Sequence, residues 1–189
     1  MGRDHCVGSL WHYGTQLAAW EPVFLAHLPA DYLLTKRIEA RTGASGLMPL
    51  GLVASVLPDL DLFRFYVLDH RRVLHHEYWT HVPFWWAVIA AAWCLGVAMM
   101  RRRKAVAGSA VFFGNIFLHL VLDTVAGGVA WFAPVSRRVF VVVNVPAGHR
   151  WWVWNFVLHW TFAVELLVIT WAVAEAVRRP AEVHCEART

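Results

Sequence analysis

The stretch that decides the fold runs from Val111 to Phe132 and reads VFFGNIFLHLVLDTVAGGVAWF. It is apolar almost throughout, and its length is sufficient to cross a bilayer core of roughly 30 Å. Asn115, His119 and Asp123 interrupt it at intervals of four residues, so on a helix they lie along one face. An acid and an imidazole inside such a segment are costly, and they indicate a functional site.

The composition is that of an integral membrane protein. Of the 189 residues, 59% are hydrophobic and only 16% are charged, whereas a soluble domain has about 25% charged residues. The net charge of +4 is carried mostly by short Arg and Lys clusters, a pattern typical of loops that set membrane topology. We therefore expect the lipid bilayer as a partner and no direct nucleic-acid binding. The sequence predicts no particular protein partner.

The length predicts one membrane-embedded domain, residues 1–180, followed by a polar and disordered tail, 181–189. The fold class expected is all-α: a multi-pass membrane bundle of about four to five helices with a polar metal site near one membrane face. Its predicted elements are a helix over 15–41 that is kinked by prolines or partly interfacial, a short apolar segment at 47–57, a span at 82–100, a helix at 105–126, a strand or extended strap at 139–145, and a last span at 151–177.

Positive charge predicts the orientation of these elements. The strongest basic stop, Arg101 to Lys104, is expected on the cytoplasmic side together with the C-terminus. This topology places His81, His119 and His159 at similar depth, far from that stop. The short segment at 47–57 delivers acids to the same layer, so separate parts of the chain bring acids and imidazoles together.

Several residues in this layer have the chemistry of metal ligands. His119 and Asp123 lie one helical turn apart and can share an ion, although Asp123 could instead only orient His119. Asp59 and Asp61 follow Pro58; they either cap a helix or bring two carboxylates to one cation. Nitrogen and oxygen ligands suit zinc, manganese or iron.

Further candidates lie on other segments. His76 and His81 stand before the span at 82–100, where Thr80 could serve as a helix cap. His27 and Asp31 repeat the His-x-x-x-Asp spacing, although Pro29 between them is expected to disturb the helix. Secondary candidates are Asn115, His159 and Glu165.

Three motifs occur in a recognisable order: Leu57-Pro58-Asp59-Leu60-Asp61, then His76 with Thr80-His81, then His119-Leu120-Val121-Leu122-Asp123 ahead of Gly127-Gly128 and Pro134. Over roughly residues 25–140 the chain resembles the bacterial YdjM-like family of membrane-bound, predicted metal-dependent hydrolases, described as LexA-binding inner-membrane proteins. That family is distantly similar to zinc-dependent phospholipase C, a helical fold with a His-x-x-x-Asp ligand pair. The resemblance implies an inner-membrane location and the metal ligands Asp59, Asp61, His76, His81, His119 and Asp123, and it matches His27 to an N-terminal family histidine.

The chain departs from the family at one motif. Where the family reads His-Arg-Gly-x-Thr-His-Ser, this chain has His76-Glu77-Tyr78-Trp79-Thr80-His81-Val82. The arginine, glycine and serine are absent. Glu77 places an acid where the family has a cation.

These observations favour a membrane-bound hydrolase that uses one or more divalent ions, with zinc preferred over manganese or iron. Asp59 or Asp61 is the predicted acceptor of a proton from water. Arg137 and Arg138 are predicted to steer an anionic phosphoester or lipid-like substrate. Two alternatives stay open: a non-catalytic scaffold or partner-binding protein with a structural polar network, and a haem protein ligated by His119 and His159.

Overall fold

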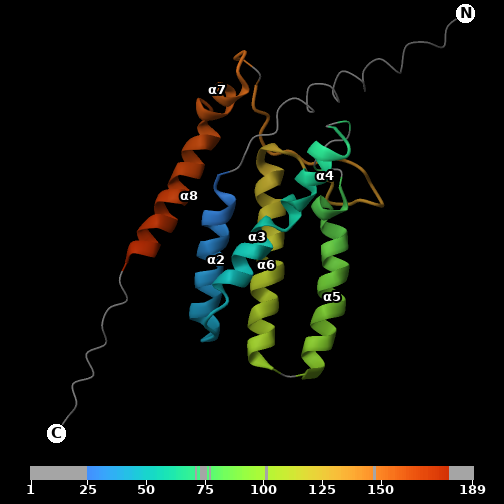
Figure 1. The fold of residues 1–189 in the computed structure, drawn as a ribbon, viewed down its shortest axis with the longest axis vertical. Coiled ribbons are helices and arrows are strands. Elements are labelled where there is room, and N and C mark those ends of the chain that lie inside the picture. The colour runs from blue at the N-terminus through green and yellow to red at the C-terminus, as the bar shows by residue number, and fades with distance from the viewer. Residues whose placement is uncertain are drawn as a thin grey trace, which may run out of the picture.

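The computed structural model describes residues 25–178 apart from 71, 73–75, 77, 101 and 147. This part of the chain is all-helical, with no strand among the described residues and one isolated bridge between Val129 and Phe140. The helices are α2 (His27–Thr42), α3 (Met48–Val56), α4 (Asp61–Val67), α5 (Pro83–Met100), α6 (Arg103–Ala126), α7 (Trp152–Val157) and α8 (Trp160–Val177), with 3-10 turns η1 (Pro58–Leu60) and η3 (Trp79–His81) (Figure 1). The tail predicted at 181–189 lies outside the described residues.

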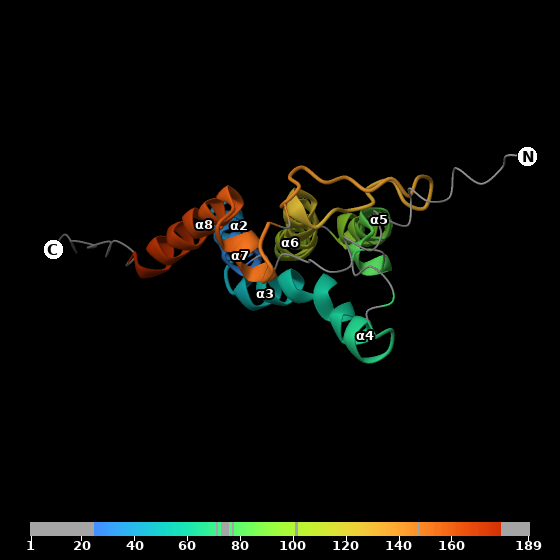
Figure 2. The ribbon, with the colours of Figure 1, turned by 90° about the horizontal axis from the view of Figure 1, so that it is seen from above.

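Helix α6 is the centre of the bundle. It packs against α2, α3 and α5, and Figure 2 shows it between α2 and α5. Ile116 and Leu120 on α6 are fully buried, and they form a core with Ala54 of α3 and Trp86 of α5. The helix ends at Gly127 and Gly128, and Gly128 has a φ of 84°, which other residues rarely adopt.

Helix α2 begins at His27, so Pro29 falls in its first turn. The first backbone N–H groups of a helix have no partner within it, so a proline there removes no hydrogen bond. The prediction that Pro29 disturbs this helix is therefore wrong. The helix ends at Gly43, whose φ of 69° and N–H bond to the carbonyl of Glu39 form a left-handed cap.

The short apolar segment predicted at 47–57 forms helix α3, which packs against α2 and α6. Helix α3 has nine residues, roughly 14 Å of helix, which is less than half a bilayer core. Pro58 follows it, and the chain turns through η1 into α4, which projects to one side in Figure 2. This turn carries Asp59 and Asp61 to the end of α6.

The last predicted span, 151–177, is broken into α7 and α8, so its prediction as one continuous helix is wrong. His159 between them is extended, with φ −86° and ψ 146°. The backbone N–H of Thr161 donates to Nδ1 of His159 over 3.4 Å, which caps α8. Helix α8 packs against α2, where Lys36 lies 3.6 Å from Glu175.

Two of the described helices, α6 and α8, are long and apolar enough to cross a membrane by length and composition; the apolar helix at 83–99 is shorter. Residues 139–145 form the strap that was one of two predicted alternatives. The N–H groups of Val142 and Val143 donate to the carbonyls of Thr124 and Val125, over 3.0 and 2.7 Å. The strap therefore covers the end of α6 that carries the acids and imidazoles.

Candidate metal centre

Acids and imidazoles from four parts of the chain meet where α6 ends. The start of α2, the turn η1, the segment around η3 and the last two turns of α6 each supply at least one of them. The side chains form three overlapping groups, in each of which one donor atom per residue lies within 4.8 Å of the others: His27 with His119 and Asp123; Asp59 with His81 and His119; His76 with His81 and Asp123.

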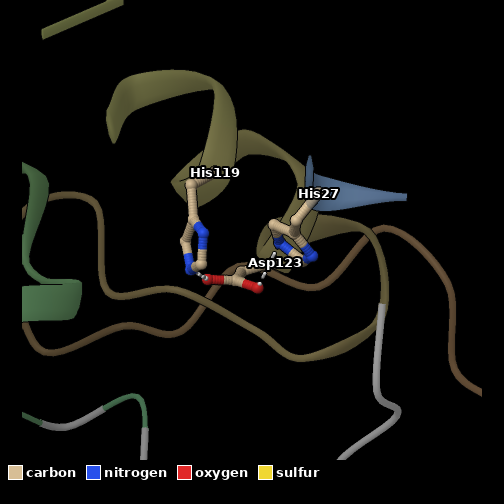
Figure 3. Close-up of side chains that lie close together, drawn as sticks. All are labelled: His27, His119 and Asp123. Atoms are coloured by element: carbon tan, nitrogen blue, oxygen red, sulfur yellow. Dashed lines mark hydrogen bonds and ion pairs between the residues drawn. The ribbon is translucent and has the colours of Figure 1, made fainter. Parts of the chain in front are cut away.

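Asp123 belongs to two of these groups. Figure 3 shows its carboxylate between the rings of His27 and His119. Oδ1 lies 3.1 Å from Nε2 of His27, while Oδ2 lies 3.2 Å from Nε2 of His119 and 3.6 Å from Nε2 of His81. Nε2 of His76 is 4.0 Å from the same Oδ2. One carboxylate thus faces four imidazoles.

Asp59 closes the cluster on its solvent side. Its Oδ1 lies 3.5 Å from Nε2 of both His81 and His119. The Asp59 side chain is 36% exposed, whereas that of Asp123 is 8% exposed. Neither η1 nor α4 has a side-chain cap, so the alternative that Asp59 and Asp61 cap a helix is wrong. Asp59 is therefore the more exposed of the two carboxylates.

Asp61 lies behind His81 and belongs to none of the three groups formed by the described residues. Its Oδ2 is 3.0 Å from Nδ1 of His81, and it accepts a hydrogen bond from the hydroxyl of Thr80. A carboxylate on Nδ1 fixes the ring and makes the other nitrogen a better metal ligand. The structure therefore gives Asp61 an orienting contact, and its ligand role stays a prediction.

His76 depends on a glycine for its position. Its Nδ1 lies 3.0 Å from the carbonyl of Gly127, and a Cβ added at Gly127 would collide with the imidazole. Asp69 accepts hydrogen bonds from Tyr78 over 2.6 Å and from Arg64 over 3.1 Å. The bond from Tyr78 lowers the pKa of Asp69, while burial and that bond raise the pKa of Tyr78 to about 12.

The residues fit a divalent cation. Nε2 of His119 and Oδ2 of Asp123 are buried, and neither makes a hydrogen bond with the described residues. Unpaired polar atoms are costly inside a protein and more so in a membrane. A cation among the three groups would accept these lone pairs. Imidazole and carboxylate donors without thiolates suit zinc, manganese or iron.

The other predicted site residues have different contacts. His159 caps α8, and its Nδ1 lies 2.9 Å from the Thr161 hydroxyl. Glu165 is 2% exposed and accepts the N–H of Leu25 over 2.9 Å, just before α2. Arg137 and Arg138 are exposed on the loop after α6. None of these residues belongs to the three groups found in the described part of the chain.

Asp31 is a buried acid beside the cluster, and in the sequence only its spacing from His27 marks it. Asp31 is fully buried on α2, and its carboxylate interacts electrostatically with His119 and His27. Asn115, one turn deeper than His119, donates to the hydroxyl of Thr35 over 2.8 Å. The sequence signal for both contacts is a spacing of four residues on each helix: His27, Asp31 and Thr35 on α2, and Asn115, His119 and Asp123 on α6.

The family model described as YdjM inner membrane protein matches residues 23–184. The chain belongs to the YdjM inner membrane protein family. This match confirms the resemblance drawn from the three motifs, and it extends over the last helix as well. Comparisons with the curated proteins and with the solved structures found no match. For this YdjM-family chain, the inner membrane is thus supported by its family and by two candidate spans.

Proposed function

We propose that this YdjM-family protein is a membrane-bound, metal-dependent hydrolase that acts on a phosphoester or lipid-like substrate. The observation that carries the proposal is that four imidazoles lie within 4.0 Å of the Asp123 carboxylate, among three ligand groups that share residues with one another. Six residues would hold one or more divalent ions: His27, Asp59, His76, His81, His119 and Asp123. Such an ion, zinc by preference, lowers the pKa of bound water and polarises a phosphoryl or acyl oxygen.

Asp59 is the better of the two predicted proton acceptors. It lies within the cluster and is 36% exposed, so an attacking water can reach it. The Asp61 side chain is 7% exposed and is engaged by Thr80 and His81. We assign Asp59 to proton transfer from water and Asp61 to the orientation of His81.

The substrate class follows from the position of the cluster and from nearby charge. His119 and Asp123 lie in the last two turns of α6, a candidate span, so the cluster sits near one membrane face. Arg137 and Arg138 are exposed on the connection that follows. A polar group carrying negative charge, such as a phosphate on a lipid, suits both features.

We also propose a multi-pass topology in which the cluster lies on the periplasmic side. Positive residues gather at the helix ends that lie away from the cluster: Lys36, Arg37, Arg41, Arg103, Lys104 and Arg178. The contact between Lys36 and Glu175 joins α2 to α8 near two of these ends. The bias of Lys and Arg toward the cytoplasm predicts that this end faces inward. A reporter that is active only in the cytoplasm should be active when it is fused after Arg178. Activity of a reporter that works only in the periplasm would reverse the assignment.

Metal analysis of the full chain purified in detergent tests the site. We expect the parent protein to hold divalent metal, and His119→Ala and Asp123→Ala to lose it, because each removes a donor shared by two groups. His159→Ala removes an imidazole outside the groups and should keep the metal. A metal-free parent, or variants with parental metal content, would contradict the proposal.

Hydrolysis of bis-p-nitrophenyl phosphate and of phosphatidylglycerol vesicles tests the chemistry. Asp59→Asn should lower kcat by about 10²- to 10⁴-fold, while other ligands retain the metal. A metal-loaded parent without hydrolysis of either substrate would favour the scaffold alternative, in which the network is structural. A Soret band in the purified protein would instead favour the haem alternative.

A further inference from the structure

Helices α2 and α6 run antiparallel and face each other through matched polar positions. At one end, Nε2 of His27 lies 3.1 Å from Oδ1 of Asp123. Eight residues farther along α2 and eight residues back along α6, Asn115 donates to the Thr35 hydroxyl over 2.8 Å. These two contacts fix the register between the helices.

The register places Asp31 opposite His119. Each lies four residues, about one turn, from both hydrogen-bonded pairs. Both side chains are fully buried. This middle position therefore pairs an acid with an imidazole inside the bundle.

Asp31 and His119, the middle pair of this interface, form no hydrogen bond with each other. Neither carboxylate oxygen of Asp31 has hydrogen-bond geometry with another described residue, and the same holds for Nδ1 of His119. Nε2 of His119 is the atom that faces the cluster, 3.2 Å from Asp123 and 3.5 Å from Asp59. Nδ1 is therefore left for a partner outside the cluster.

His81 shows what such a partner does. Its Nε2 faces Asp59 and Asp123, while its Nδ1 contacts Asp61 over 3.0 Å. Imidazoles that bind metal usually donate their other N–H to a carboxylate, which fixes the ring and strengthens the ligand. Asp31 lies where His119 needs the same support.

We propose that Asp31 is the positioning carboxylate of His119, accepting the Nδ1–H directly or through one water molecule. The inference rests on the proposed metal site, because it explains how His119 presents Nε2 as a ligand. It also accounts for a fully buried acid on α2 that the six ligands do not use. Asp31 acts through His119 and does not touch the ion.

Asp31→Asn tests the proposal, because asparagine keeps the size and removes the charge. Zinc affinity of the full chain, measured by competition with a chromogenic chelator, should fall by about 10- to 100-fold. Thr35→Val is the matched control, one turn along the same buried face of α2. It removes the hydrogen bond with Asn115 and should lower thermal stability without changing zinc affinity. An Asp31→Asn variant that binds zinc as tightly as the parent would overturn the proposal.

A second readout needs no metal. Nitrogen-15 NMR of histidine-labelled protein reports the state of Nδ1, and the His119 signal is assigned by its absence in His119→Ala. Asp31→Asn should shift this signal, whereas Thr35→Val should leave it in place. A metal-free parent would overturn the proposed function. In that protein a shifted signal would still support the contact between Asp31 and His119, and an unshifted one would refute it.

Discussion

Helix α6 has two buried faces, one apolar and one polar, and they differ in which contacts their buried side chains make. On one face, Ile116 and Leu120 are fully buried among apolar side chains of α3 and α5. On the other face, Asn115 and His119 are equally buried against α2. The apolar face is satisfied by packing, whereas both ring nitrogens of His119 lack hydrogen bonds among the described residues.

This difference separates stability from function. Well-packed apolar side chains stabilise helix association in membranes. Partly satisfied polar groups at the same depth destabilise the fold unless a ligand engages them. We infer that the apolar face holds the bundle together and that the His119–Asp123 end of the polar face is kept for binding. Variants on the two faces should therefore change different measured quantities.

Ile116→Ala should have the largest effect on stability. It leaves a cavity beside Ala54 and Trp86, and such substitutions lower the free energy of unfolding by about 2–5 kcal/mol. Reversible unfolding in detergent measures this loss. Metal content of the folded fraction should stay at the parental value, because no ligand is moved. Loss of metal together with stability would show that the two faces are not independent.

Gly127→Ala should have a smaller effect, on the polar face alone. The added methyl group collides with the ring of His76, so His76 must leave its position. Zinc affinity should fall about 10-fold, measured by chelator competition. Gly96→Ala is the control, because nothing lies within 4 Å of a Cβ added there. Equal affinities for the two variants would show that His76 is not a ligand.

The sequence predicts the polar face of α6 well, because a four-residue spacing on a helix is a local property. His119 and Asp123 were expected to meet acids from another segment, and the structure brings Asp59 to them. The role of Asp61 could not be read from the sequence, since the fold decides which side of His81 each of the two carboxylates reaches.

The register between α2 and α6 was also beyond the sequence. The spacing of His27 and Asp31 was visible, but pairing Asp31 with His119 requires knowing that the helices are antiparallel and how far each is shifted. The break at His159 was missed for a related reason: the apolar pattern continues through 151–177, and only the capping bond to Thr161 shows that the helix restarts. Long-range contacts and caps inside apolar runs thus limit such predictions.

Tyr78→Phe should have the smallest effect, because it removes one connection outside the three ligand groups, the hydrogen bond between Tyr78 and Asp69. The variant loses the bond from Tyr78 to Asp69, while Arg64 still contacts Asp69. Since the folded pKa of Tyr78 is raised to about 12, its stabilising contribution is fully present below about pH 10. That contribution is lost as the pH rises through about 12. The parent's stability advantage over the variant, measured by unfolding between pH 8 and pH 12, should therefore shrink at the alkaline end. An advantage that grows with pH would show that the hydroxyl does not stabilise this connection.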